Sequence, residues 1–220
     1  MKLNNISILL LTFVHLVGYP QTEHPFSESV KELSQKYDSI YDPSKETIVF
    51  TGSSSIRFWT SLEQSFPEHQ IINTGFGGSQ ASDLLFFVDE LVLKYNPTQV
   101  FIYEGDNDLW EKKRPNEIVR TTSEIINRIK EKDQHAQIVL ISAKPSMSRW
   151  PIRGKYKRLN RKLKRLSLSD PTLAFADVWY PMLDKRKLMT DIFIEDGLHM
   201  NQKGYDIWYT ALYNFINHPK

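Results

Sequence analysis

Five short runs of apolar and β-branched residues are the sequence feature that most constrains how this chain can fold. They recur along the chain at 47–50, 70–73, 99–103, 138–141 and 173–178. Each run is almost continuously hydrophobic rather than alternating, which is typical of strands that are covered on both faces. The runs therefore predict a mainly parallel five-stranded sheet.

Segments with helical periodicity separate these runs. Ser82 is expected to cap a helix that ends before Asn96 and Pro97, and Pro115 is expected to open another. Further helices are expected at 27–41, 156–168 and 202–216. This alternation of strands and helices predicts an α/β fold, a three-layer α/β/α sandwich.

The composition fits one globular domain. Of 220 residues, 40% are hydrophobic and 12% aromatic, which excludes a disordered, fibrous or disulfide-stapled chain. With 28 basic against 26 acidic residues, the formal net charge of +2 favours neither a nucleic-acid nor an acidic partner. The absence of cysteine excludes a disulfide, a thiolate metal site and a cysteine nucleophile.

The first twenty residues differ from the rest. Lys2 precedes an uncharged, mostly apolar run at 6–17, and Gly18 to Pro20 end it. A helix of that length spans about 18 Å, too short for a bilayer core of ~30 Å. The pattern predicts a signal peptide at 1–20, a secreted or periplasmic protein, and a domain at 21–220 without stable membrane insertion. An uncleaved anchor or a buried helix is the alternative.

The loops that follow the first two strands are candidate sites, because open α/β sheets bind ligands at the carboxyl ends of their strands. Loop 51–57 contains three serines after a glycine, which fits either a nucleophile at a helix N-terminus or a cluster of capping residues. Loop 73–79 has three glycines in four positions. These glycines either let backbone N–H groups approach a ligand or form a tight turn.

The loop after the third strand carries acids, and a later segment pairs an acid with a histidine. Residues 104–108 hold three acids and an amide, but an EF-hand loop needs glycine where Glu111 stands, so we expect no metal. Asp196 and His199 lie three residues apart around a glycine, so one carboxylate can hold Nδ1 of the ring. A catalytic serine needs such a base and such an orienting acid.

Taken in order, these segments resemble the SGNH hydrolases, also called GDSL-type esterases and lipases. The resemblance spans residues 50–199. Its four blocks are Phe50-Thr51-Gly52-Ser53-Ser54, Asn73-x-Gly75-x-x-Gly78, Gly105-Asp106-Asn107-Asp108 and Asp196-x-x-His199. The chain departs from the family at Ser53, where the name-giving motif has aspartate, and this leaves Ser55 as an alternative to Ser54.

The resemblance implies a flavodoxin-like sandwich that hydrolyses acyl esters without a metal or other cofactor. The residues it assigns are Ser54 as nucleophile, Asp196 and His199 as acid and base, and Gly78 and Asn107 as oxyanion-hole donors. The implied partner is a small-molecule or polysaccharide ester, not a nucleic acid. These assignments come from the family's pattern and not from composition or spacing.

Several functions fit these residues. We favour an exported serine esterase that removes acetyl groups from carbohydrate, because the chain has a signal-like segment and no long apolar lid segment. The alternatives are a lysophospholipase-like lipid esterase, a non-catalytic carbohydrate- or lipid-binding module, and acyl transfer to an acceptor other than water.

Three further features bear on binding. Residues 149–165 contain nine Lys or Arg and no acid, yet a leucine stripe in this stretch favours a solvated helix face packed on the sheet over an anion-binding patch. Arg57 and Arg149 are expected at the rim of the site, where they would favour an anionic substrate group. The aromatic residues near the loops can either stack on a sugar or pack in the core. They are Phe58, Trp59, Phe76, Trp110 and Trp150.

Overall fold

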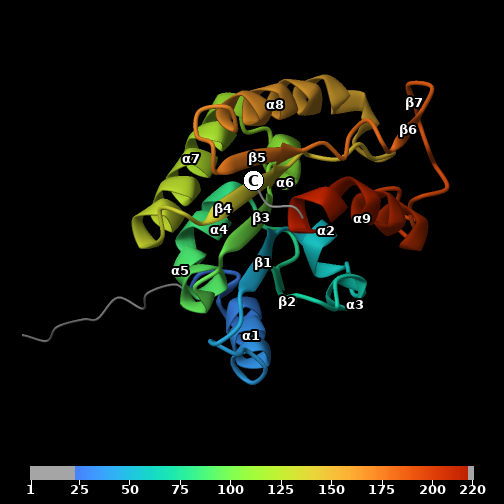
Figure 1. Cartoon of the computed structure of the whole chain (residues 1–220). Coiled ribbons are helices and arrows are strands. Elements are labelled where there is room, and N and C mark those ends of the chain that lie inside the picture. The colour runs from blue at the N-terminus through green and yellow to red at the C-terminus, as the bar shows by residue number, and fades with distance from the viewer. Residues whose placement is uncertain (1–22, 218–220) are drawn as a thin grey trace, which may run out of the picture.

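The computed structural model describes residues 23–217, so the expected signal peptide lies outside the described residues (Figure 1). Five strands form one parallel sheet in the order β2-β1-β3-β4-β5. They are β1 (Thr47–Gly52), β2 (Gln70–Gly75), β3 (Gln99–Tyr103), β4 (Gln137–Ile141) and β5 (Leu173–Ala176). The predicted parallel sheet is confirmed, and its strand order is that of flavodoxin-like folds.

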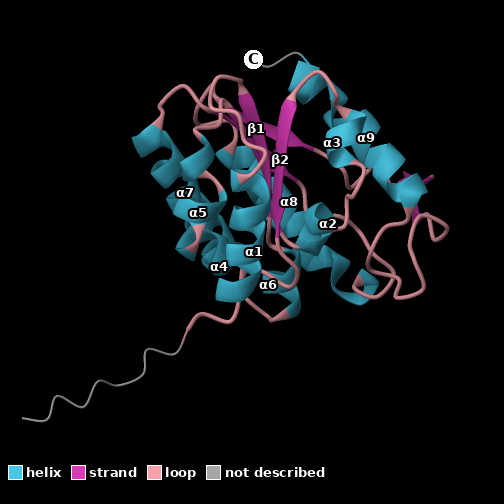
Figure 2. Cartoon of the chain, turned by 90° about the horizontal axis from the view of Figure 1, so that it is seen from below, coloured by secondary structure: helices cyan, strands magenta, loops and turns pink. Residues whose placement is uncertain are grey.

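Helices cover both faces of the sheet and complete the expected three layers (Figure 2). One face is covered by α1 (Ser27–Asp38), α4 (Ala81–Phe86), α5 (Val88–Leu91), η1 (Leu93–Tyr95), α7 (Pro115–Lys132) and α8 (Arg153–Leu166). The other face is covered by α2 (Ser54–Arg57), α3 (Leu62–Ser65) and α9 (Gln202–Asn217). The remaining elements are α6 (Asp106–Trp110), η2 (Trp150–Ile152) and a hairpin of β6 (Leu183–Asp184) and β7 (Lys187–Leu188).

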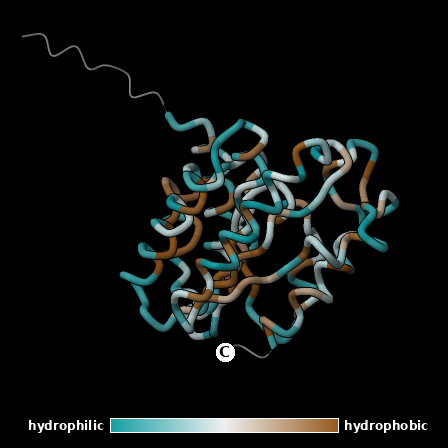
Figure 3. Tube along the Cα trace, turned by 90° about the horizontal axis from the view of Figure 1, so that it is seen from above, coloured by the Kyte–Doolittle hydropathy of each residue, from teal (hydrophilic) through white to brown (hydrophobic). Residues whose placement is uncertain are grey.

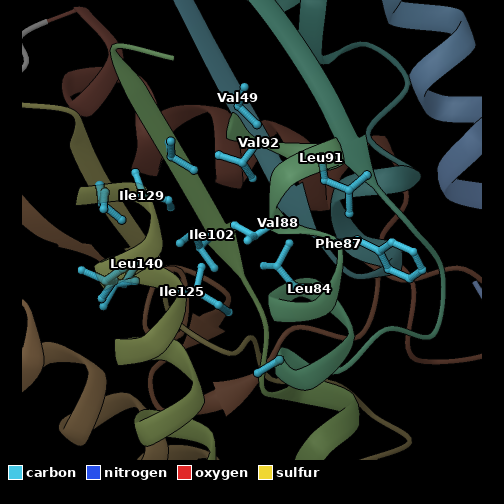
Figure 4. Packing of buried hydrophobic residues seen from close by; sticks show 14 of the residues in the cluster. Val49, Leu84, Phe87, Val88, Leu91, Val92, Ile102, Ile125, Ile129 and Leu140 are labelled. Atoms are coloured by element: carbon cyan, nitrogen blue, oxygen red, sulfur yellow. The ribbon is translucent and has the colours of Figure 1, made fainter. Parts of the chain in front are cut away.

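The core consists of two apolar layers, one on each side of the sheet. Strand residues alternate between them: Val49 and Ile102 pack under α4, α5 and α7 (Figure 4), whereas Phe50 and Phe101 stack on the opposite face with ring centroids 4.2 Å apart. Hydrophobic residues accordingly concentrate inside the sandwich, and hydrophilic ones lie along its outer turns (Figure 3). Burial on both faces explains why the strands read as continuous apolar runs.

The helix expected after Ser82 differs from the prediction. It begins at Ala81, where the Gln80 N–H donates a 2.8 Å hydrogen bond to the Asp83 carboxylate, so Ser82 does not cap it. The helix is also divided into α4, α5 and η1, because the backbone leaves helical angles at Phe87 and Val92. No Pro or Gly marks either break, and the apolar periodicity continues through both. Periodicity alone therefore could not predict them.

The remaining helix predictions agree with the structure to within about three residues. Pro115 occupies the first turn of α7, where its missing N–H leaves no helical bond unmade. Within residues 23–217, no helix is at once long enough and apolar enough to cross a membrane.

Gly52 and Gly154 provide a matched pair for testing the turn after β1. Gly52 has φ +123°, and a Cβ there would lie 2.0 Å from the Tyr103 carbonyl oxygen, whereas a Cβ at Gly154, in α8, would meet no atom within 4 Å. We expect Gly52→Ala to lower the free energy of unfolding by about 3 kcal/mol or more. Gly154→Ala should raise it by about 0.5–1 kcal/mol. Urea unfolding of both variants measures this, and equal shifts would contradict the account.

Candidate active site

The loops that follow β1, β2 and β3 meet at the carboxyl edge of the sheet. β1 lies between the other two strands, so its loop is adjacent to both of theirs. The Phe76 N–H donates to the Gly52 carbonyl at 2.8 Å, and the Asn107 side-chain amide donates to the Ser79 carbonyl, also at 2.8 Å. These bonds hold the three loops together.

Ser54 is the first residue of α2, directly after the turn made by Gly52 and Ser53. Ser53 is extended and buried, and its N–H donates to the Tyr103 carbonyl at 3.1 Å. This turn brings the Ser54 hydroxyl to 2.9 Å from Nε2 of His199. Ser55 is buried, and its carbonyl accepts a hydrogen bond from the Tyr205 hydroxyl. The hydroxyl that meets the imidazole is therefore that of Ser54.

Asp196 holds His199 from the other side of the ring. One carboxylate oxygen lies 2.5 Å from Nδ1, and the other accepts the backbone N–H groups of Leu198 and His199 at 2.8 and 2.9 Å. Because a carboxylate accepts the Nδ1 proton, Nε2 is left as the acceptor of the Ser54 hydroxyl. Partial burial acts to raise the pKa of Asp196, but these hydrogen bonds outweigh it and hold that pKa below its ordinary value.

Neighbouring residues fix the position of this turn. Gly197 adopts φ +62°, and its carbonyl accepts the backbone N–H groups of Met147 and Ser148, which follow β4. The ring of Phe58 packs edge-on against the imidazole with centroids 4.8 Å apart. The Phe58 ring therefore restrains the imidazole, and the β4 loop restrains the turn that carries it.

Three N–H groups at this edge have no hydrogen-bond acceptor among residues 23–217. Among residues 23–217, the backbone N–H groups of Ser54 and Gly78 donate to no other group. The Asn107 amide carries two hydrogens, of which one is used by the Ser79 carbonyl, so the other remains available. Gly78 has φ +85°, a conformation that suits glycine and shapes this loop.

The acidic loop after β3 binds protein groups. Glu104 accepts the Ser79 hydroxyl at 2.7 Å, and Asp108 accepts the Ala81 N–H. Asp106 is engaged by four other side chains. Among residues 23–217, no group of three or more His, Cys, Asp or Glu side chains is arranged to hold a metal ion.

Asp106 lies at the centre of a buried polar network. Its carboxylate, 4% exposed, accepts the Tyr103 hydroxyl at 2.8 Å and the Tyr156 hydroxyl at 2.5 Å. It also forms ion pairs with Lys144 and Arg149. Burial alone would raise the pKa of Asp106, but the two cations and the two hydroxyls hold it below its ordinary value. Asp106 is therefore an ionised carboxylate inside the protein.

Lys144 is a residue of this network that the sequence reasoning missed. Its side chain is fully buried, its Nζ lies 3.7 Å from Asp106, and it donates a 2.7 Å hydrogen bond to the Leu198 carbonyl. It thus joins the acidic loop to the turn that carries His199. The sequence feature that could have identified Lys144 is its position three residues after β4, at the same sheet edge as the other loops.

The two arginines expected at the rim differ in their burial and in their contacts. Arg57 is exposed, and its side chain forms no hydrogen bond or ion pair with residues 23–217. Arg149 is buried, and its guanidinium pairs with Asp106 and donates to the Asn107 side-chain oxygen at 2.9 Å. In the structure Arg149 is therefore a buried residue held by protein acceptors, not an exposed residue of the rim.

The basic stretch forms α8 as expected. Its apolar stripe, with Leu159 and Leu163, is buried against the sheet, and most of its Lys and Arg residues are exposed. The aromatics divide into two groups. Trp59 and Phe76 belong to the core, whereas Phe58 is 45% exposed and Trp110, at the end of α6, is 51% exposed.

The fold and site define a parallel α/β protein with a serine, histidine and aspartate joined at the carboxyl edge of its sheet. A sequence model of the GDSL-like Lipase/Acylhydrolase family matches residues 38–207, and the chain belongs to that family. It is therefore a carboxylic ester hydrolase. No curated protein sequence matches the chain significantly.

Solved structures share the fold at low sequence identity. A GDSL-like lipase from Bacteroides thetaiotaomicron superposes with a TM-score of 0.73 at 19% identity, over 86% of this chain and 97% of that one. A lipase/acylhydrolase from Enterococcus faecalis superposes with a TM-score of 0.67 at 21% identity, over 78% of this chain and 95% of that one. A mutant of an acetyl-xylooligosaccharide esterase from Geobacillus stearmophilus superposes with a TM-score of 0.65 at 20% identity, over 78% of this chain and 94% of that one.

Protonation of the buried Glu104 carboxyl should make the free energy of unfolding depend on pH. Glu104 is 5% exposed, and one of its carboxylate oxygens accepts no hydrogen bond from residues 23–217. Burial is the main cause that raises the pKa of Glu104 well above its ordinary value, and the nearby charge of Asp108 is the second. A raised pKa stabilises the fold while the pH is below the unfolded value of about 4.3, and this stabilisation is lost as the pH rises through the folded value. Glu104→Gln, which mimics the protonated acid, should remove that loss.

We therefore expect the free energy of unfolding of Glu104→Gln to exceed that of the wild type by an amount that grows from pH 4 to pH 8. Urea unfolding at several pH values measures the difference. The other carboxyl groups are present in both proteins, so their contributions to the pH dependence largely cancel in the difference. A difference that stays constant with pH would contradict the assignment.

Proposed function

We propose that the chain hydrolyses esters through an acyl-enzyme formed on Ser54, with His199 as general base and Asp196 as the orienting acid. The continuous hydrogen-bonded series from Asp196 through His199 to the Ser54 hydroxyl carries this proposal. A serine hydroxyl is a weak nucleophile on its own, and such a series is how a base activates it.

The reaction proceeds in two halves. Ser54 Oγ attacks the ester carbonyl while its proton passes to Nε2 of His199, and Asp196 stabilises the imidazolium. The C–O bond to the alcohol then breaks, and the imidazolium gives its proton to the leaving alkoxide. In the second half, His199 takes a proton from a water molecule as that water attacks the acyl-enzyme carbonyl. The bond from the acyl carbon to Ser54 Oγ then breaks, the imidazolium returns its proton to Ser54 Oγ, and the carboxylic acid is released.

The tetrahedral intermediate of each half carries a negative oxygen. The proposed donors to it are the backbone N–H groups of Ser54 and Gly78 and the remaining hydrogen of the Asn107 amide. These groups are held before the reaction, so little reorganisation accompanies the developing charge. A single donor of this kind is typically worth about 2.7–4 kcal/mol in the transition state.

For the substrate, we propose an acetyl ester of a carbohydrate. The exposed faces of Phe58, which touches His199, and Trp110, on the helix that carries Asn107, offer surfaces on which a sugar ring can stack. Proteins of the same fold include the acetyl-xylooligosaccharide esterase and a carbohydrate esterase family 3 protein from Talaromyces cellulolyticus. The signal-like residues 1–20 support export, where polysaccharide is encountered.

A fluorophosphonate serine probe tests the nucleophile. We expect the wild type and Ser55→Ala to be labelled and Ser54→Ala to remain unlabelled, because only the Ser54 hydroxyl contacts the base. Labelling is read by intact-protein mass, with circular dichroism to check that each variant is folded. Ser55→Ala is the matched control, since it removes a hydroxyl one residue away.

Other outcomes have definite meanings. Loss of labelling only in Ser55→Ala would move the nucleophile by one residue. A folded wild type that neither labels nor hydrolyses any ester would favour the non-catalytic binding module.

A panel of esters tests the substrate class. We expect acetyl esters, including acetylated xylan, to be hydrolysed with a kcat/KM at least about tenfold above that of decanoyl or longer esters. Release of acetate and fatty acid is measured directly. A preference for long acyl chains would overturn the carbohydrate assignment in favour of a lysophospholipase-like enzyme, and acyl products formed on added sugars would indicate transfer.

A further inference from the structure

Arg149 contacts two adjacent residues of α6, Asp106 and Asn107. It is 8% exposed and lies in the segment between β4 and η2. One terminal nitrogen of its guanidinium pairs with a carboxylate oxygen of Asp106, and the other donates to the side-chain oxygen of Asn107 at 2.9 Å. A planar guanidinium presents its donors in a fixed fork, so both contacts are made in one orientation.

This contact holds the oxygen end of the Asn107 amide. A guanidinium donates hydrogen bonds but cannot accept them, so the atom that faces Arg149 must be the amide oxygen. The amide nitrogen then faces the Ser79 carbonyl, to which it donates at 2.8 Å. Of its two hydrogens, one is used there and one is left. Arg149 and the Ser79 carbonyl thus hold the amide from its two ends, and together they fix where the free N–H of Asn107 lies.

The charges behind Asn107 reinforce this effect. Asp106 is the one carboxylate that pairs with Arg149 and Lys144 among residues 23–217, so two basic side chains face a single acid. A guanidinium bonded to the amide oxygen also draws electron density from the amide and strengthens its N–H as a donor, since hydrogen bonds in series polarise one another. Both effects favour an anion at the free N–H.

We propose that Arg149 is a positioning residue for oxyanion stabilisation, which acts by holding and polarising the side-chain amide of Asn107. The inference rests on the proposed function, because it assumes that Asn107 donates to the oxyanion. Arg149 itself does not touch the reacting atoms. Its effect on the reaction must therefore pass through Asn107, and this can be measured.

Arg149→Lys is the variant to test, because Arg149→Ala would leave Asp106 short of a partner and risks unfolding. A lysine keeps the positive charge next to Asp106 but, as a point charge, does not reproduce the fork that also reaches Asn107. Arg158→Lys is the matched control, since Arg158 is an exposed residue of α8. Circular dichroism checks that each variant is folded.

We expect Arg149→Lys to lower kcat for a chromogenic acetate ester by about 10- to 100-fold with little change in KM, because an oxyanion contact is made in the transition state and not in the ground state. Asn107→Ala should lower kcat by about 100- to 1000-fold. Adding Arg149→Lys to Asn107→Ala should lower kcat by no more than about threefold further, since no amide remains to be positioned. Arg158→Lys should stay within about twofold of the wild type.

The rate of labelling by the fluorophosphonate probe is a second readout. Its phosphoryl oxygen occupies the same hole, so the same pattern among the variants is expected without knowledge of the natural substrate. The inference would be overturned by an unchanged rate in Arg149→Lys, or by equal losses with and without Asn107. Failure of the proposed function is distinct, because the wild type itself would then neither label nor turn over.

Discussion

A single buried carboxylate, that of Asp106, links the elements that form the candidate active site. Removing an ionised carboxylate from water is unfavourable unless cations and hydrogen-bond donors surround it. Here these partners come from three elements, and they are Tyr103 in β3, Lys144 and Arg149 after β4, and Tyr156 in α8. The sheet, the β4 loop and the helix must therefore come together in one arrangement for the carboxylate to be buried.

That arrangement is joined to Asn107 and His199 of the candidate site by two short connections. Arg149 extends from Asp106 to the amide of Asn107, and Lys144 extends from Asp106 to the carbonyl of Leu198, the residue before His199. Asn160 in α8 supports the same loop, since its amide bonds both the N–H and the C=O of Ala143 at 2.9 Å. The basic helix therefore contributes to the site from its buried face, which gives α8 a role that its exposed charge does not suggest.

Much of the fold and of the proposed site could be predicted from the sequence, because those features depend on local patterns. Continuous apolar runs predicted the five strands, and Pro115 marked the start of α7. The pairing of Asp196 with His199 could be predicted without any tertiary contact, because the two side chains meet across one tight turn. By contrast, Lys144 went unnoticed and Arg149 was placed at the rim, because their partners lie about 40 residues away in the chain.

By itself, the sequence determined the strand–helix alternation, the family and the set of polar residues at the strand ends. It could do so because burial on both faces of a sheet and the blocks of a family are written in consecutive residues. Only the tertiary structure decided which serine meets the imidazole, which way the Asn107 amide points and which charges are buried. These depend on contacts between segments far apart in the chain, which the packing of the sandwich alone brings together.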